Sequence, residues 1–311
     1  MIRVTTVSVV ICAYTDRRWD ELVDAVASVR AQTAPPSEIV VSVDHNPALR
    51  ERVSRQLPDV IVTDNQQQQG LSGARNAGVA VAGGEVVAFL DDDATAEPDW
   101  LERLTAGYAD PDVLGVGGAI EPVWLTSRPR CFPEEFDWVV GCTYRGLPQT
   151  LAPVRNLIGA NMSFRRTVLN TIGGFRCDIG RIGTRPLGCE ETELCIRSRR
   201  RWPNGLFLYD PSARVRHRVP TSRASWRYFH ARCYAEGLSK AVVAKASDAR
   251  SGLASERVYT LRVLPRGMVR GVAETFTRGD PAGLGRSAMI ATGLAVTTAG
   301  YLVGTASDMM R

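Results

Sequence analysis

The most constraining feature of the sequence is a short apolar run that ends in three consecutive aspartates. Val86 to Leu90 contains no polar residue and follows Gly83-Gly84, so it predicts a β-strand buried on both faces. Asp91 to Asp93 come next, at the carboxyl end of that strand, which is the edge where open α/β sheets bind ligands. Their carboxylates suit Mg²⁺ or Mn²⁺, and such a metal would neutralise a diphosphate. A solvated acidic turn before a helix near Pro98 is an equally simple interpretation.

The composition is that of an ordinary globular protein. The chain has 311 residues, 44% of them hydrophobic and 23% charged, which allows one large domain or two small ones. Seven cysteines form no C-x-x-C pair and no metal-binding spacing. No signal-peptide pattern is present at the N-terminus, so we expect reduced thiols and a cytoplasmic protein.

The net charge of +5 is concentrated towards the C-terminus. Residues 221–311 carry thirteen Lys and Arg against six acids, and the remainder is slightly acidic. A basic segment on a nearly neutral body predicts contact with an anionic surface such as phospholipid. Nucleic acid is the alternative, but no nucleic-acid-binding motif accompanies the charge, and we expect no nucleic-acid partner.

The N-terminal half alternates between strand-like and helix-like segments. Strand patterns cover 7–13, 39–43 and 60–63, and helical patterns run up to Gln32 and onwards from Gly70. This alternation predicts an α/β fold with a mostly parallel, Rossmann-like sheet flanked by helices. The first strand ends at Ala13-Tyr14-Thr15 and lacks G-x-G-x-x-G, which disfavours a nicotinamide or flavin dinucleotide. After Gly117-Gly118 the pattern loosens.

Three places in this half could together hold a nucleotide. Asp44 ends the second strand, Arg75 and Asn76 lie on the helix after Gly70, and the triplet at Asp91 to Asp93 could hold a metal. Taken alone, Arg75 and Asn76 are as simply explained by an exposed helix face.

Four segments, in this order and at this spacing, resemble the family 2 inverting glycosyltransferases of GT-A fold. They are Val7–Tyr14, Val41–Asp44, Gly73–Gly78 and Asp91–Asp93. The resemblance implies a nucleoside-diphosphate sugar as donor, a UDP-sugar before others, and Mn²⁺ or Mg²⁺ as cofactor. It places the donor nucleotide against Ala13, Tyr14, Asp44, Arg75, Asn76, Asp91 and Asp92.

The same resemblance implies a metal-binding set. Asp93, together with Asp91, would ligate the cation that bridges the diphosphate. His217 stands where members of the family often have a histidine that ligates the metal or the diphosphate. A lone histidine is as often structural.

A second acidic site follows at Gly188–Leu194, where a loop enters a helix. Sugar transfer with inversion needs a base that deprotonates the acceptor hydroxyl, and a carboxylate near that hydroxyl can serve. Acids also favour any first helical turn, which is the simpler interpretation. The family usually has Glu followed by Asp here, with Asp as the base. Glu191 takes that place, so it is the predicted base, with Glu190 in reserve.

Acceptor contacts are predicted from the middle and the end of the chain. By resemblance, Asn161 faces the reaction centre, and Arg232 and Lys240 on a helix at 226–240 contact phosphates. Trp124 could stack on a sugar ring, although such an aromatic residue more often belongs to the core.

The last part of the chain has a membrane-seeking pattern. Arginines recur among apolar residues from Arg257 to Arg286, as in a basic amphipathic surface helix. Ser287 to Ser307 contains no charged residue and is long enough to span a bilayer, although a buried or interfacial helix is as consistent. The preceding arginines favour the cytoplasmic side.

We therefore predict a GT-A domain over 1–220 and a basic helical segment over 221–311. Residues 1–118 would bind the nucleotide sugar, and 119–220 would form the acceptor half. The middle and the tail resemble a prokaryotic subgroup of lipid-linked glucuronosyl or glucosyl transferases, so a polyprenyl-linked sugar or a growing glycan is the expected acceptor. The enzyme would lie at the inner face of the cell membrane, with a single membrane helix as a variant.

Two alternatives remain open. One is a non-catalytic nucleotide-sugar-binding or scaffold protein at the membrane, although that protein would not need acids at both sites. The other is a sugar nucleotidyltransferase, but residues 7–20 lack the Gly-rich basic motif usual in that class.

Overall fold

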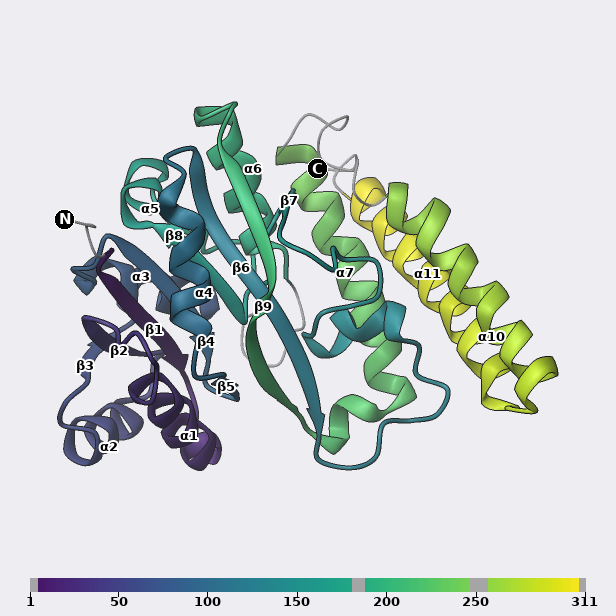
Figure 1. Cartoon of the computed structure of the whole chain (residues 1–311), viewed down its shortest axis with the longest axis horizontal. Coiled ribbons are helices and arrows are strands. Elements are labelled where there is room, and N and C mark those ends of the chain that lie inside the picture. The colour runs from purple at the N-terminus through teal and green to yellow at the C-terminus, as the bar shows by residue number, and fades with distance from the viewer. Residues whose placement is uncertain (1–4, 181–187, 247–256, 308–311) are drawn as a thin grey trace. The chain divides into compact units, whose positions relative to one another are not determined.

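The computed structural model describes residues 5–180, 188–246 and 257–307 (Figure 1). The chain forms two compact units. The first comprises residues 1–121, 148–185 and 190–217, and the second comprises 122–147, 186–189 and 218–311. The sequence-based divisions after residues 118 and 220, and the roles assigned to each part, stay predictions.

The first unit is built on one sheet with the strand order β3-β2-β1-β4-β8-β6-β9-β5, and β7 pairs with β9. Four neighbouring strands are parallel: β3 (Ile61–Asp64), β2 (Glu38–Val43), β1 (Val7–Ala13) and β4 (Val86–Asp91). The others are β5 (Ala94–Ala96), β6 (Val113–Trp124), β7 (Ala152–Val154), β8 (Asn161–Arg165) and β9 (Leu206–Val219). Strand β8 pairs antiparallel with both β4 and β6, and β5 and β7 pair antiparallel with β9. The parallel half supplies the predicted nucleotide-binding edge.

Helices α1 (Trp19–Arg30), α2 (Pro47–Gln56), α3 (Leu71–Val81), α4 (Trp100–Ala106), α5 (Arg166–Ile172) and α6 (Glu190–Arg201) flank this sheet. Their boundaries follow from local chemistry. In α1, Leu22, Val26 and Val29 recur at helical spacing and are fully buried. Helix α2 starts where the Asn46 side chain accepts a hydrogen bond from the Leu49 amide, at 3.0 Å, with Pro47 next in the chain.

The core of the first unit lies around β4. Val86 to Leu90 are all buried, as the apolar run predicts. The Phe89 ring packs edge-to-face on Phe175, with ring centroids 5.5 Å apart, and Phe164 packs on Phe207 at 6.0 Å. Such pairs stabilise a core beyond the area they bury. The core thus fixes β4, and with it the aspartates at its end.

The chain stays extended after Gly117-Gly118, where the sequence pattern loosens. Strand β6 continues to Trp124. A Cβ atom on Gly118 would lie 1.8 Å from the Ala213 carbonyl oxygen, so only glycine permits this close approach to β9. The glycine marks a close strand contact rather than the end of the strand.

The second unit is helical. It contains α7 (Trp226–Ala246), α10 (Leu264–Arg278) and α11 (Ala282–Ser307), the 3₁₀ helices η3 (Glu134–Val140) and η4 (Thr221–Ala224), and the short π-helix η5 (Tyr259–Val263). Small residues let α11 pack closely on both neighbours. A Cβ on Gly300 would lie 2.2 Å from the Tyr234 carbonyl oxygen of α7, and one on Gly283 would lie 2.2 Å from the Gly271 carbonyl oxygen of α10. Among the described residues, α11 (from Ala282 to Ala306) is the one helix long and apolar enough to cross a membrane.

Candidate active site

The carboxyl ends of β1, β2 and β4 meet at one edge of the sheet, because these three strands are parallel and adjacent. Cys12 in β1 is in register with Asp91 in β4. The Asp44 amide, just after β2, donates to the Ala13 carbonyl oxygen at 2.8 Å. Ala13, Asp44 and Asp91 therefore lie together at the sheet edge where the sequence analysis predicted ligand binding.

Three predicted metal ligands converge next to this edge. One ligand atom from each of Asp91, Asp93 and His217 can be chosen so that all three lie within 4.8 Å of one another. His217 Nε2 is 3.1 Å from Asp93 Oδ1, and both side chains are buried. His217 reaches the site because β9 pairs antiparallel with β5, with His217 opposite Ala94. Two carboxylates and an imidazole form a donor set suited to a divalent cation.

Arg18 is a site residue that the sequence analysis missed. Its Nη1 atom lies 2.7 Å from Asp92 Oδ1 and 3.1 Å from Asp93 Oδ2. It belongs to η1 (Asp16–Arg18), the polar turn directly after β1, and its guanidinium lies 5.5 Å from the centre of the half-exposed Tyr14 ring. The position of this polar turn, directly after the predicted strand β1, could have indicated from the sequence that Arg18 lies at the site. Arg18 supplies positive charge to the aspartates.

Burial dominates the electrostatics of Asp92. Removal from water raises the pKa of its carboxyl to about 7, although the adjacent Arg18 charge acts in the opposite direction. Its Oδ2 atom has no hydrogen-bond partner within the described part of the chain. Asp92 is thus held through its other oxygen by Arg18, which also contacts Asp93.

Arg75 is buried, so the exposed-face interpretation of this helix position does not apply. Its Nη1 atom lies 2.8 Å from Glu190 Oε1, and its Nη2 atom lies 3.8 Å from Asp91 Oδ1. It also donates to the Gly159 carbonyl oxygen at 3.2 Å and packs over the Phe175 ring. A buried arginine requires such partners. Arg75 therefore joins the Asp91 edge to the first turn of α6.

The two glutamates at the start of α6 are placed differently. Glu190 is 4% exposed, and one of its oxygens is taken by Arg75. Glu191 is the next residue of the same turn and is only partly buried. The positive end of the helix dipole favours a charged carboxylate at both positions. The geometry assigns Glu190 to an ion pair, and the role of Glu191 as base stays a prediction.

Asp44 and Asn76 are both held by local hydrogen bonds. Asp44 accepts from the Gly70 amide at 3.0 Å and from the Asn65 side chain at 2.7 Å, which fixes its carboxylate at the start of α3. Asn76 Nδ2 donates to the Phe175 carbonyl oxygen, and its Oδ1 accepts from the Phe175 amide, both at 2.8 Å. Asn76 thus holds the segment after α5, and Asp44 lies at the edge predicted to bind the nucleotide.

Asn161, predicted to face the acceptor, is fully buried and uses its side chain within the protein. Its Oδ1 accepts from Trp100 Nε1 at 2.8 Å, and its Nδ2 donates to the Ala119 and Ala213 carbonyl oxygens, each at 2.8 Å. These bonds tie β8 to α4, β6 and β9. An acceptor contact through this side chain would replace one of them.

The other predicted acceptor residues belong to the second unit. Arg232 Nη1 and Lys240 Nζ lie 2.9 Å and 3.7 Å from different oxygens of Glu236, so both cations converge on one acid. Trp124 packs edge-to-face on Phe132, with ring centroids 5.4 Å apart. The phosphate and sugar contacts assigned to them stay predictions.

The fold and this site define a glycosyltransferase of GT-A type, with an Asp-x-Asp pair at the end of β4. The chain belongs to glycosyl transferase family 2, whose model matches residues 8–173. The resemblance on which this family and fold were predicted is thereby confirmed.

Individual relatives agree with this assignment. The chain is 39% identical over 241 residues to a glucosyl-dolichyl phosphate glucuronosyltransferase of Haloferax volcanii, covering 76% of this chain and 77% of the relative. It is 26% identical over 237 residues to the succinoglycan biosynthesis protein ExoM of Rhizobium meliloti, covering 73% and 71% of the two chains.

Solved structures share the fold at low identity. The mannosyltransferase PcManGT from Pyrobaculum calidifontis, in complex with GDP-Man and Mn²⁺, superposes with a TM-score of 0.60 at 19% identity, covering 99% of this chain and 88% of its own. GalNAc-T7 with UDP, GalNAc and Mn²⁺ superposes with a TM-score of 0.53 at 20% identity, covering 69% and 43%. At these sequence identities, the structural similarity supports only the fold assignment.

Proposed function

We propose that this glycosyltransferase is metal-dependent and inverting, and that it moves a sugar from a nucleoside-diphosphate sugar to a hydroxyl of a lipid-linked sugar or growing glycan. A UDP-sugar is the preferred donor. The observation that carries the proposal is the convergence of Asp91, Asp93 and His217 beside the edge that holds Asp44. Donors of this kind present a diphosphate, and a divalent cation at such an edge is suited to bind it.

The chemistry of the donor set fits Mn²⁺ or Mg²⁺. Two carboxylates supply hard oxygen donors, and the imidazole of His217 favours Mn²⁺ over Mg²⁺. Asp93 and His217, with Asp91, would hold the ion. When bound, the ion would neutralise charge that develops on the departing diphosphate.

The protein residues have separate tasks in this scheme. Asp44 is fixed beside the nucleotide edge by Gly70 and Asn65, and it accepts a hydrogen bond from the base or ribose. Arg75 holds Asp91 and the first turn of α6 together. Glu191 takes the proton from the acceptor hydroxyl as that oxygen attacks the anomeric carbon from the face opposite the diphosphate.

Support for a lipid-linked acceptor comes from the Haloferax volcanii relative, whose name specifies a glucosyl-dolichyl phosphate acceptor and a glucuronosyl group. A polyprenyl-phosphate sugar and a glucuronosyl or glucosyl donor are therefore the first pair to test. Such an acceptor is anchored in a membrane, in agreement with the basic C-terminal segment. We place the enzyme at the cytoplasmic face.

The test is release of free nucleoside diphosphate by the purified full chain. A panel of UDP- and GDP-sugars is incubated with Mn²⁺, Mg²⁺ or chelator, with and without a membrane lipid extract. Asp93→Asn is the site variant. Asp20→Asn, an exposed acid on α1, is the matched control because it removes the same charge away from the site.

We expect metal-dependent release from one donor, increased by lipid, absent in Asp93→Asn and retained in Asp20→Asn. If no donor in the panel releases nucleoside diphosphate but the protein still binds nucleotide, the non-catalytic binding protein would be favoured. Release of nucleoside diphosphate by Asp93→Asn at the wild-type rate would refute the assignment of the metal site.

A further inference from the structure

Helix α10 and the turn before it expose a continuous apolar stripe. Leu261, Val269 and Phe276 are 74%, 69% and 79% exposed, and Val258 and Val272 are also exposed. Val269, Val272 and Phe276 are three and four residues apart on α10, so they share one helical face, and Leu261 lies in the π-helix that leads into it. Exposing such large apolar side chains to water costs free energy, which is recovered when a membrane or another protein surface covers them.

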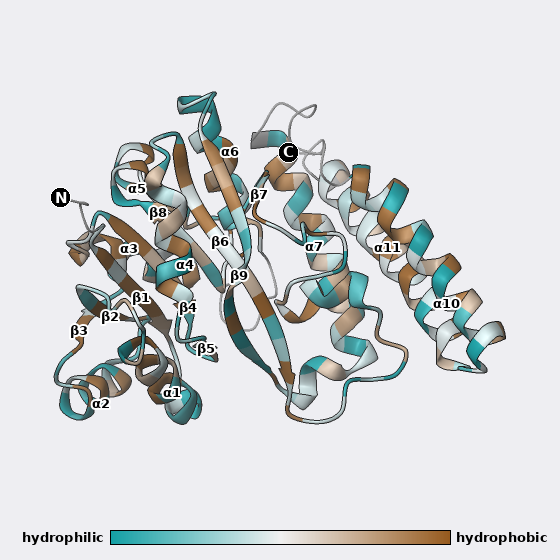
Figure 2. Ribbon diagram, viewed as in Figure 1, coloured by the Kyte–Doolittle hydropathy of each residue, from teal (hydrophilic) through white to brown (hydrophobic). Residues whose placement is uncertain are grey.

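Arginines accompany this stripe. Arg262 and Arg266, one helical turn apart, are exposed, and neither has an ion-pair partner among the described residues. Arg270, a further turn along, instead pairs with Glu135 and lies 4.0 Å from Glu274. Figure 2 shows strongly hydrophilic and strongly hydrophobic residues along α10. An apolar stripe beside exposed arginines matches the surface of a bilayer, which has anionic headgroups outside and hydrocarbon beneath them.

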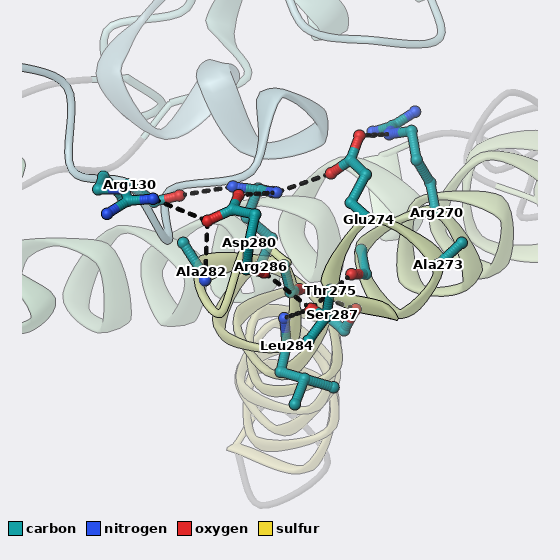
Figure 3. Close-up of polar contacts among 12 residues, drawn as sticks. Arg130, Arg270, Ala273, Glu274, Thr275, Asp280, Ala282, Leu284, Arg286 and Ser287 are labelled. Atoms are coloured by element: carbon teal, nitrogen blue, oxygen red, sulfur yellow. Dashed lines mark hydrogen bonds and ion pairs between the residues drawn. The ribbon is translucent and has the colours of Figure 1, made fainter. Parts of the chain in front are cut away.

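A polar network fixes α10 on α11 (Figure 3). Arg286 of α11 lies 2.7 Å from Glu274 Oε2 and 2.8 Å from Asp280 Oδ2, and it donates to the Arg130 carbonyl oxygen at 2.9 Å. Thr275 Oγ1 accepts from the Leu284 amide at 3.0 Å across the turn. The two helices therefore form one hairpin, and the stripe on α10 has a defined orientation within it.

Helix α11 is an unsuitable membrane span in this arrangement. Its glycines pack against α7 at Gly300 and against α10 at Gly283, so a span would carry both neighbours into the hydrocarbon. Helix α7 carries Arg232, Glu236 and Lys240, and charged side chains are costly there. Close helix packing accounts for the glycines of α11, while 22% of its apolar window is buried.

We propose that α10 lies in the plane of an anionic phospholipid bilayer, with its apolar stripe in the interface and Arg262 and Arg266 against lipid phosphates. Helix α11 supports α10 through the contacts at Gly283 and Arg286. The bilayer is preferred to a protein partner because Arg262 and Arg266, exposed beside the stripe, complement an acidic headgroup layer. This inference rests on the proposed function for its lipid-linked acceptor, but vesicle binding itself requires neither donor nor acceptor.

The test is co-sedimentation of the full chain with vesicles of phosphatidylcholine alone, or of phosphatidylcholine mixed with phosphatidylglycerol. We expect binding to the anionic vesicles that weakens with salt. The pair Leu261→Ser and Phe276→Ser together should weaken binding at least tenfold, because two apolar side chains that the bilayer would cover are lost. Arg262→Gln with Arg266→Gln should weaken it about 25-fold on anionic vesicles, since each arginine contributes roughly a factor of five.

Leu302→Ser is the matched control, because Leu302 is an exposed leucine of α11. We expect its vesicle binding to match that of the wild type. Circular dichroism checks that every variant is folded. Without lipid, the Leu261/Phe276 variant should release nucleoside diphosphate from the donor at the wild-type rate. With an acceptor carried in vesicles, it should transfer less sugar and release correspondingly less nucleoside diphosphate.

Several results would overturn the inference. Resistance of the wild type to alkaline carbonate extraction, or loss of binding in Leu302→Ser alone, would make α11 the membrane element. A dimer in sedimentation analysis that dissociates in Phe276→Ser would make the stripe a contact between copies of this chain. Vesicle binding without any donor turnover would leave this inference standing and refute the proposed function instead.

Discussion

The buried pair of Arg75 and Glu190 provides a sharp test of how the two glutamates of α6 divide their roles. Arg75 is 2% exposed and Glu190 is 4% exposed, and their charged atoms lie 2.8 Å apart. Removing one partner of such a pair costs about 3–5 kcal/mol, because the other charge stays buried. Asp91, 3.8 Å from Arg75, retains part of the compensation. We therefore expect about 3 kcal/mol for Glu190→Gln, which corresponds to a fall of roughly 6–12 °C in Tm.

The assay is thermal unfolding followed by circular dichroism, with urea unfolding as a second measure. Glu51→Gln, on the exposed face of α2, is the matched control and should leave Tm unchanged. The double variant Arg75→Met with Glu190→Leu should recover at least half of the loss, since apolar residues can replace a buried ion pair at little cost. Glu191→Gln should unfold close to the wild-type temperature.

Two outcomes would refute this reasoning. An unchanged Tm in Glu190→Gln would mean that Arg75 does not depend on this partner. An unchanged Tm combined with complete loss of sugar transfer would make Glu190, rather than Glu191, the base.

The remaining predictions concern charge at three other positions. Glu191→Gln should retain nucleotide binding but lower the rate of sugar transfer at least a hundredfold, as measured by product formation at saturating donor; a rate near that of the wild type would remove Glu191 as the base. Arg18→Gln should raise Mn²⁺ affinity several-fold in calorimetric titration, because Arg18 and the ion compete for Asp93; a lower affinity would mean that Arg18 positions the ligands instead. Burial raises the pKa of Asp137 from 3.8 to about 6, against the effect of its partner Arg128, so the folded state binds this proton more tightly than the unfolded state does. Stability should therefore fall by up to about 3 kcal/mol as pH rises from about 4 to about 6, and Asp137→Asn should remove that slope in urea unfolding; an unchanged slope would contradict the assignment.

The sequence predicted those parts of the fold and site that depend on local pattern. Val86 to Leu90 is an uninterrupted apolar run, so its place in the centre of the sheet and the aspartates at its end follow from neighbouring residues. Asp44 was found for the same reason, because it ends a strand that is parallel to β1 and adjacent to it. In a parallel sheet, the ends of adjacent strands meet at one edge.

Long-range contacts escaped the same reasoning. The pairing of Arg75 with Glu190 joins residues 115 positions apart, and no local pattern indicates it. The bonds that saturate Asn161 come from α4, β6 and β9, so its burial depends on three elements placed by the whole fold. His217 was selected by resemblance alone, whereas its approach to Asp93 depends on the antiparallel register of β9 with β5.

The central claim is that Asp91, Asp93 and His217 hold a divalent cation that binds the donor diphosphate. Its most direct test is a calorimetric titration of Mn²⁺ into the full chain, with and without UDP, for the wild type and Asp93→Asn. The account predicts that UDP tightens Mn²⁺ binding, that Mn²⁺ tightens UDP binding by the same factor, and that the variant loses both effects. UDP binding at equal strength with and without Mn²⁺, or coupling unchanged in the variant, would contradict it.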